Sequence, residues 1–263
     1  MMKLDYGTQL SPEPIKLSVG TLRKPKLFEI AELNFDAFDI YEMFLKLTPE
    51  IFYTKLKGND EKAYWESLSE EQRENITLYD LILNDDSLQK TYQEILNFFF
   101  VEIVVYNNGL FFLFKNRTDK TSDITQDDIC GIIHKDIFPE ILDLIQQICC
   151  INDKKESPEN LKFKNKIARS IYEKMLNAKK KEKKKRKADV NLSLPNIISS
   201  ISNIHPSISP INVWELTVFQ LIDSFIRLQE NTMFSIDCTR VSVWGDEKKT
   251  FNATLWYKNR YDK

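Results

Sequence analysis

The stretch Val101-Glu-Ile-Val-Val-Tyr-Asn-Asn-Gly-Leu-Phe-Phe-Leu-Phe114 contains the clearest strand signal of the chain. β-Branched and aromatic residues, which favour strands, dominate both of its halves. Between the halves, Asn107-Asn-Gly109 supplies residues that accept a positive φ, as a tight hairpin turn requires. The sequence therefore predicts a central β-hairpin.

A shorter hairpin is predicted near the start of the chain. Ile15-Lys-Leu-Ser-Val19 alternates apolar and polar residues, and the apolar pattern resumes at Leu22 after Gly20-Thr21. Alternation with a period of two is typical of a half-buried strand, and Pro25 marks its end.

Helical periodicity surrounds both hairpins, and it predicts helices that face a common core. Three stripes carry this pattern: Phe35, Phe38, Tyr41 and Leu45; Leu88, Tyr92, Ile95, Leu96 and Phe99; and Ile137, Ile141, Leu144, Ile145 and Ile148. Pro139 fits the first turn of the third helix, and Thr125 to Asp128 fits a capping box. We expect residues 1–151 to form an N-terminal α+β domain.

A basic segment divides the chain. Lys179 to Lys187 contains eight basic residues in nine, and residues 162–187 carry a net charge of +11 within a chain whose total is −2. Apolar residues at intervals of four precede the run, at Phe163, Ile167, Ile171 and Met175. We expect residues 152–190 to connect two domains through an amphipathic and then lysine-rich helix, whose second half is either a solvated extension or a basic tether.

Residues 191–263 are predicted to form a smaller C-terminal domain. Leu194-Pro195 begins a short helix, and Asn212 with Glu215 is expected to cap a longer one. The alternating segment Phe234 to Val243 predicts one strand or two strand fragments. The fold class is therefore mainly helical α+β: a short N-terminal hairpin, a central hairpin packed with helices, a basic helical linker, and a helix-plus-strand C-terminal domain.

Catalytic groups are sparse. His134 and His205 are the two histidines, and neither has a Cys or carboxylate at metal-binding spacing. The carboxylate pairs Asp85-Asp86 and Asp127-Asp128 could serve a metal, but each also suits the start of a helix. No Walker loop, dinucleotide fingerprint or nucleophile elbow is present. We expect no enzyme, no cofactor and no metal; an enzyme with unfamiliar residues is the alternative.

The chain is expected to be cytoplasmic and to avoid membranes. No stretch approaches the roughly 18 apolar residues of a membrane span, and the first residues lack the apolar core of a signal peptide. Cys130, Cys149, Cys150 and Cys238 are expected to be buried free thiols, which suits that compartment.

Two groups of residues are candidates for binding a partner. The basic group is Lys179, Lys180, Lys183, Lys184, Lys185 and Arg186. It can contact an acidic protein surface, nucleic acid or an import receptor, or simply be a solvated linker. Because no aromatic residue lies between Tyr172 and Trp214, base stacking there has no support, and nucleic acid is the less favoured partner.

The aromatic group is Trp244, Trp256 and Tyr257, near the end of the chain. Aromatic residues dominate binding hot spots, so these three can form a recognition surface. Core packing is the alternative for each of them.

Two segments resemble a known family. They are Leu17-Ser-Val-Gly-Thr-Leu-Arg-Lys-Pro-Lys-Leu-Phe-Glu-Ile30 and Ile211-Asn-Val-Trp-Glu-Leu-Thr-Val-Phe-Gln-Leu-Ile-Asp-Ser-Phe225, the latter followed by Val243-Trp-Gly245 and Leu255-Trp256. Both are similar to segments of tail-module proteins of tailed phages and prophages of Gram-positive bacteria, which are generally regarded as tail assembly chaperones or other tail morphogenesis factors.

The resemblance implies a non-enzymatic task in the host bacterial cytoplasm. Such a protein would bind the tape-measure protein, the tail tube protein or both during tail assembly, and it could be oligomeric. One alternative is a structural tail or baseplate component that stays in the virion. A nucleic-acid-binding accessory protein is the third.

Overall fold

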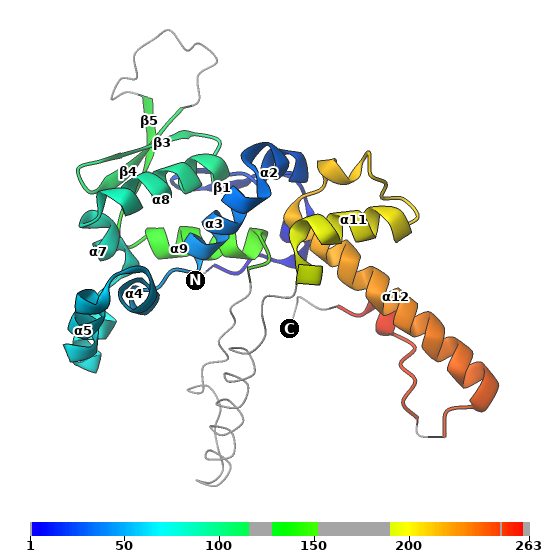
Figure 1. Ribbon diagram of the computed structural model, residues 1–263. Coiled ribbons are helices and arrows are strands. Elements are labelled where there is room, and N and C mark those ends of the chain that lie inside the picture. Colours follow the sequence, from blue (N-terminus) through cyan, green and yellow to red (C-terminus); the bar gives the residue numbers. More distant parts are fainter. Residues whose placement is uncertain (1, 116–127, 152–189, 248, 260–263) are drawn as a thin grey trace.

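The computed structural model describes residues 2–115, 128–151, 190–247 and 249–259. Most described residues are helical, and two small antiparallel sheets accompany the helices, so the predicted mainly helical α+β class is confirmed. Figure 1 shows a central body with two projections, one made by α4 to α6 and the other by the distal half of α12.

The helices of the N-terminal half are α1 (Tyr6–Leu10), α2 (Leu27–Leu33), α3 (Phe35–Leu45), α4 (Pro49–Ile51), the π-helix η1 (Phe52–Leu56), α5 (Asn59–Ser67), α6 (Glu70–Asn75), α7 (Leu78–Leu83), α8 (Asp86–Phe99) and α9 (Phe138–Ile148). Those of the C-terminal half are the 3-10 turn η4 (Val190–Leu192), α11 (Leu194–Ile204), the 3-10 turn η5 (Val213–Glu215), α12 (Val218–Trp244) and the 3-10 turn η6 (Leu255–Tyr257). The three helical stripes and the helix beginning at Leu194 are thereby confirmed. The Asp85 side chain accepts hydrogen bonds from the N–H groups of Ser87 and Leu88 and thereby caps α8. Asp85 therefore lies at the start of a helix, as the sequence indicated.

Both predicted hairpins are confirmed. Strands β1 (Ile15–Leu17) and β2 (Gly20–Leu22) pair antiparallel, as do β3 (Ile103–Asn107) and β4 (Leu110–Phe114). The β3–β4 turn has φ of 48° at Asn108 and 80° at Gly109, which is the combination that a two-residue hairpin needs.

The sequence did not reveal the third strand of the larger sheet. Strand β5 (Ile129–Ile133) pairs antiparallel with β4, with a register shift between Leu113 and Phe114. Residues 116–127 lie outside the described residues, and so does most of the capping box expected at Thr125 to Asp128. Strand β5 begins at Ile129, so no helix that starts near Thr125 continues past that residue.

Aromatic contacts join the larger sheet to the helices beneath it. The Phe138 ring of α9 stacks on Phe111 of β4 at 6.0 Å and meets Tyr92 of α8 edge-on at 5.5 Å. Such pairs add about 0.5–1.5 kcal/mol beyond the burial of their area. Tyr79 of α7 joins this group, and its hydroxyl donates to the carbonyls of Gly109 and Ile133 at 2.8 and 3.2 Å. Burial raises the pKa of Tyr79 to about 12.

Residues 20–27, named here the strap, run from strand β2 of the first hairpin to the start of α2. The Arg23 N–H donates to the Phe99 carbonyl at 2.8 Å, and the Arg23 guanidinium lies over the ring of Phe98 at 5.4 Å. The buried Lys24 ammonium donates to the carbonyls of Thr8 and Ser11, which ties down α1. The strap therefore contacts both α1 and α8.

The other end of the strap pairs with the C-terminal half. Lys26 and Thr217 form an isolated antiparallel bridge, and the Leu27 N–H donates to the Leu216 carbonyl at 2.9 Å. The Lys26 ammonium also meets the Glu215 carboxylate at 2.6 Å. The two segments that carry the family resemblance, 17–30 and 211–225, thus touch each other directly.

The long helix differs from the sequence expectation at both ends. The predicted start at Asn212 and Glu215 is wrong, because that segment is η5, and α12 begins after Thr217, whose capping box uses Gln220. The strand expected over residues 234–243 is also wrong, since α12 continues to Trp244 without Gly or Pro. The alternation there is also compatible with a helix, because it places Phe234, Cys238 and Val241 on one helical face.

A single group of contacting buried residues spans both halves of the chain. Ile198, Ile201, Val213, Val218 and Leu221 belong to the same core cluster as the buried residues of the first 151. The division into domains 1–151, 152–190 and 191–263 stays a prediction, and residues 152–189 lie outside the described part. Among the helices that are described, none is long and apolar enough to cross a membrane.

We predict that Gly131→Ala destabilises the fold. A Cβ at this position of β5 would lie 1.9 Å from the Val19 carbonyl oxygen, a backbone atom of the β1–β2 turn, so the two sheets would have to separate. The expected loss is about 1–3 kcal/mol in the free energy of unfolding, measured by urea denaturation. Gly58→Ala is the control, because its Cβ would meet only the Glu61 carboxylate, which can move. Equal effects of the two substitutions would contradict the close approach.

Candidate functional site

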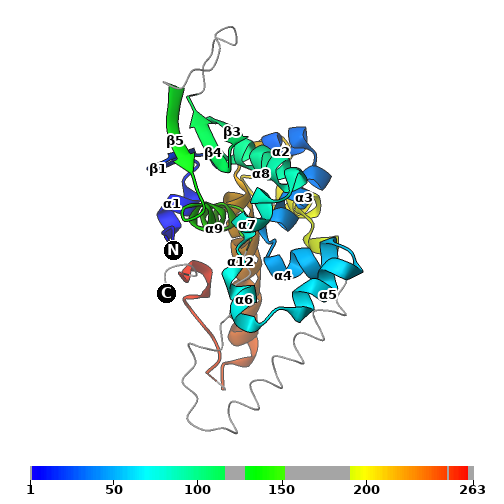
Figure 2. The ribbon, with the colours of Figure 1, turned by 90° about the vertical axis from the view of Figure 1, so that its left-hand side faces the viewer.

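The aromatic candidates lie on the α12 projection, here called the arm. Trp244 is the last residue of α12 and is 76% exposed. Trp256 and Tyr257 are exposed in η6, which packs against α12, and their rings meet edge-on at 4.8 Å. Trp244 lies at the tip of the arm, and η6 lies closer to the body (Figures 1 and 2). The structure therefore places these residues on the surface but does not gather them into one site.

The basic candidates cannot be placed. Lys179, Lys180, Lys183, Lys184, Lys185 and Arg186 all lie outside the described residues. Their assignment as partner-binding residues stays a prediction.

Exposed apolar side chains concentrate in the C-terminal segment. Among the described residues, the eight most exposed large hydrophobic side chains all lie beyond residue 190. They are Ile211, Trp244, Ile204, Val243, Leu192, Ile236, Tyr257 and Met233. Met233 is the least exposed of them at 55%, and Tyr64 of the first half follows at 52%. Single exposed apolar residues are normal, and these eight lie on η4, the end of α11, the loop before η5, the distal half of α12 and η6, which makes the C-terminal segment the candidate contact region.

A hollow of about 260 Å³ lies between α11, the start of α3 and the loop that precedes η5. Its lining residues are Phe35, Pro195, Ile198, Ser199, Ser202, Asn203, Pro210, Val213 and Trp214. Small-molecule sites usually measure about 300–1,000 Å³. The hollow is smaller than that range and suits one apolar side chain of a partner better than a cofactor.

The loop beside this hollow presents Ile211 to solvent. Ile211 directly follows the lining residue Pro210 and is 88% exposed. The Asn212 amide oxygen accepts the Ser209 N–H at 2.7 Å, and its amide nitrogen donates to the Ser207 carbonyl at 3.0 Å. The Trp214 indole N–H donates to the Pro210 carbonyl at 3.0 Å. These local bonds fix the loop, so Ile211 is held outward before any partner arrives.

His205 belongs to this loop and has a structural role there. Its Nδ1 atom accepts the N–H groups of Ser207 and Ile208, both at 3.2 Å. The exposed loop was not recognised as a site from the sequence. One feature of the sequence could have identified this loop as a candidate site. Ile211 is an isolated apolar residue between Pro210 and Asn212, in a loop that is rich in Ser.

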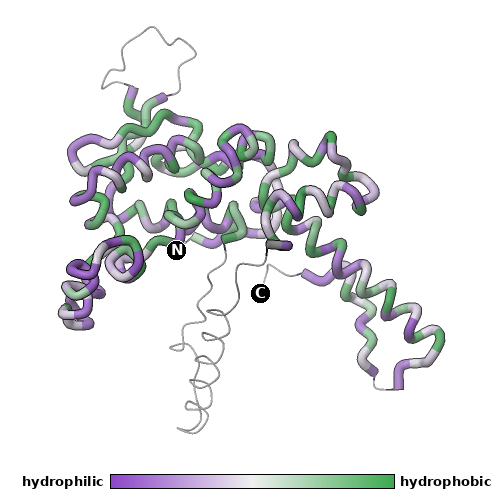
Figure 3. The backbone as a smooth tube through the Cα atoms, viewed as in Figure 1, coloured by the Kyte–Doolittle hydropathy of each residue, from purple (hydrophilic) through white to green (hydrophobic). Residues whose placement is uncertain are grey.

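The arm has one covered face and one open face. Phe234 stacks on Phe251 at 5.8 Å, where residues 249–259 run back along α12. The Asp246 carboxylate accepts the N–H groups of Thr250 and Phe251, and the bond from Phe251 is the main cause of its lowered pKa. Hydrophobic positions nevertheless recur on α12 out to its tip (Figure 3). Ile236 is one of those that the returning segment leaves exposed.

A buried polar network fixes the root of the arm. The Tyr6 hydroxyl donates to the Asp223 carboxylate at 3.0 Å, and the Arg227 guanidinium meets the same oxygen at 3.3 Å. The other oxygen, Asp223 Oδ1, is buried and has no hydrogen-bond partner among the residues that the structure describes. Burial is the main cause of the raised pKa of Tyr6. The network joins α1 to the first turns of α12, where Tyr6 and Phe219 also pack at 6.1 Å.

Within the described ranges, no three His, Cys, Asp or Glu side chains lie close enough together to hold a metal ion. His134 pairs with Asp136 at 3.3 Å in an exposed turn. The expectation that the protein has no catalytic centre stays a prediction. What the described surface offers is apolar contact area on fixed elements.

The comparisons with known proteins concern mainly this same segment. Residues 179–261 match the family described as the YomV second domain. That family name is phage-derived, so the match supports a phage-related protein. The comparison with curated proteins and the comparison with solved structures gave no match. The matched segment includes the exposed loop, the arm and η6.

The four cysteines are free, but their burial is uneven. Cys149 is buried, Cys150 and Cys238 are partly buried, and Cys130 is exposed, so the expectation that all are buried is wrong for Cys130. Burial raises the pKa of Cys149 well above its usual value and that of Cys150 to about 12.

We predict that a thiol reagent near pH 8 modifies Cys130 first and leaves Cys149 and Cys150 unmodified in the native protein. Burial raises the pKa of all three thiols and so lowers their thiolate fractions, but Cys130 is the exposed one, whereas burial blocks access to the sulfur of Cys149 and limits access to that of Cys150. Peptide mass spectrometry after timed alkylation measures the rate at each site, and urea-unfolded protein is the control in which all sites react. Cys149 reacting as fast as Cys130 in native protein would contradict this packing.

Proposed function

We propose that the protein is a non-enzymatic phage tail assembly factor that holds another tail polypeptide, the tape-measure protein, the tail tube protein or both. The observation that carries the proposal is the concentration of exposed apolar side chains in residues 190–259. That segment also contains most of the match to a phage-related family. The likeness of segments 17–30 and 211–225 to tail-module proteins supports the same function.

Ile211, the hollow beside it and the aromatic pair of η6 suit this task. Affinity usually rests on a few anchors that become fully desolvated, and rigid anchors lose less entropy on binding. The loop that carries Ile211 is already fixed by its own hydrogen bonds. The basic run would add long-range attraction to an acidic partner and thereby speed encounter.

The direct test is co-expression with the other proteins of the tail gene cluster, followed by affinity capture. A complex with the tape-measure or tail tube protein supports the proposal. Mass spectrometry of purified virions separates an assembly factor from its alternative. A fixed copy number in finished particles would make the protein a structural tail or baseplate component, whereas an assembly factor acts in the host cytoplasm and is left behind.

We predict that Ile211→Ser and Trp256→Ala each weaken capture of the tail partner. Loss of a buried anchor costs about 2 kcal/mol or more, which is a Kd increase of at least about tenfold. Tyr64→Ser is the matched control, because Tyr64 is similarly exposed on the opposite projection. Titration by calorimetry gives the three Kd values. If Tyr64→Ser weakens binding as much as the other two, the surface has been assigned to the wrong half.

The basic run is predicted to act on rate more than on affinity. Neutralising Lys183, Lys184 and Lys185 removes attraction that operates before contact, so association should slow and become less salt-sensitive. Stopped-flow association at several ionic strengths measures both effects. An unchanged association rate together with a faster dissociation rate would place these lysines inside the interface instead.

A further inference from the structure

The open face of the arm has the spacing of a coiled-coil seam. Met233, Ile236, Arg240 and Val243 follow one another at intervals of three, four and three, which is the a, d, a, d pattern of a heptad repeat. All four lie on the distal half of α12. The three apolar members are exposed, so this seam, as we name the four residues, is uncovered in one copy of the chain.

The ring contact of the returning segment lies on a different face of the helix from the apolar residues of the seam. Phe234, which stacks on Phe251, is at a b position when Met233 is at a. The b position lies about 100° around the helix from a, because each residue turns the helix by that angle. The returning segment reaches the seam at Arg240, whose guanidinium donates to the Thr250 hydroxyl at 3.5 Å, and it leaves the apolar residues Met233, Ile236 and Val243 exposed to another helix.

The residues beside the seam are compatible with burial. Thr232 and Thr239 occupy g positions, and their hydroxyls donate to the carbonyls of Leu228 and Ser235 within the same helix, at 2.9 and 3.0 Å. Their donors are thus already used, so covering them leaves no unpaired hydroxyl hydrogen. Both side chains are also small enough to let a second helix approach closely.

We propose that the seam binds the seam of a second copy of the chain, with the two arms antiparallel. Charge decides the orientation. A parallel pair would place Arg240 against Arg240 in one layer, which brings like charges together at a buried position. An antiparallel pair places Arg240 opposite Ile236 of the second copy and beside its Asp237. The intrahelical pair of Arg240 and Asp237, now 3.2 Å apart, would gain two symmetric counterparts across the interface.

The same register matches large side chains with small ones. It sets Met233 against Val243 of the second copy. Because the arrangement is two-fold symmetric, each contact occurs twice, as in any isologous interface. Trp244, which is 76% exposed in a single copy, occupies an e position and would lie at the edge of the interface.

The pairing should be weak. The exposed part of the arm spans about two heptads, or about 20 Å of helix. An interface of that size falls below the roughly 1,200 Å² of standard stable complexes. We therefore expect a monomer–dimer equilibrium at micromolar concentrations. The pairing does not depend on the proposed function, because the partner anchors Ile211 and Trp256 are not part of the seam.

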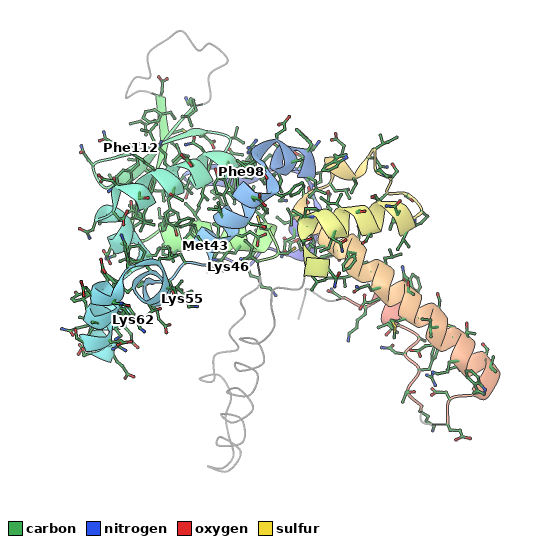
Figure 4. All side chains as sticks on the ribbon, viewed as in Figure 1. Met43, Lys46, Lys55, Lys62, Phe98 and Phe112 are labelled. Atoms are coloured by element: carbon green, nitrogen blue, oxygen red, sulfur yellow. The ribbon has the colours of Figure 1, made fainter. Side chains whose placement is uncertain are left out.

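Sedimentation equilibrium of the full chain over micromolar to submillimolar concentrations tests the pairing. The wild type should change from monomer to dimer, and Ile236→Lys should raise the dissociation constant at least about tenfold, because its ammonium would face Arg240 of the second copy inside the interface. Met43→Lys is the matched control, since Met43 is an exposed residue of α3 (Figure 4), and it should dimerise like wild type. Ile236 is exposed, so circular dichroism should show that the helix content of the variant is unchanged. A wild type that stays monomeric, or an Ile236→Lys variant that still dimerises, overturns the proposal.

Disulfide trapping tests the orientation. In a background with Cys130→Ser and Cys238→Ser, Met233→Cys and Val243→Cys are made as separate proteins with different tags. Antiparallel arms predict a crosslink between the two variants when they are mixed and oxidised, and little crosslinking of either variant with itself. Self-crosslinking of each variant, with no preference for the mixed product, would show parallel arms and overturn the proposed arrangement.

Discussion

The position of the arm depends on one backbone contact, the pairing of the strap with the start of α12. The Leu27 N–H and the Leu216 carbonyl join at 2.9 Å, beside the bridge between Lys26 and Thr217. Thr217 is also the residue that caps α12, so the same residue fixes where the helix begins and where it is attached. The remaining bonds of the strap reach α1 and α8. A displacement at this point would therefore move the whole arm relative to the core.

The root of the arm adds a second restraint of a different kind. The Tyr6 hydroxyl donates to the carboxylate of the Asp223–Arg227 ion pair, and the second, buried Asp223 oxygen has no hydrogen-bond partner within the described part of the chain. Such an arrangement is a weak source of stability, because desolvation offsets much of the attraction between the charges. Its geometry is specific, however. It holds α1 against the first turns of α12, and the distal half of that helix, which bears the seam, extends away from the body (Figure 1).

Local signals in the sequence were sufficient for much of the fold. The Asn-Gly turn, the alternation around Gly20 and the apolar stripes predicted both hairpins and the helices α3, α8, α9 and α11, because each is decided within a few neighbouring residues, whereas the short helices α1, α2 and α4 to α7 were not predicted. The strand expected over residues 234–243 was wrong, since a period of two and a period of 3.6 both fit that short segment. Strand β5 was missed because its pairing with β4 is made across residues 116–127. The exposure of Ile211 likewise depends on the folded loop, although Trp244, Trp256 and Tyr257 were recognised as surface candidates.

A dimer formed through the arms would carry two copies of the apolar surface that includes Ile211 and η6. Each copy keeps its own Ile211 and η6, since neither is part of the seam, so an antiparallel dimer would offer two equivalent surfaces. A partner with repeated apolar segments, as expected of a long tape-measure protein, could then engage both. The second contact becomes intramolecular, and overall binding can exceed the strength of either contact alone by two or more orders of magnitude. Weak self-association and modest single-site affinity would therefore be enough to hold a long chain during assembly and to release it afterwards.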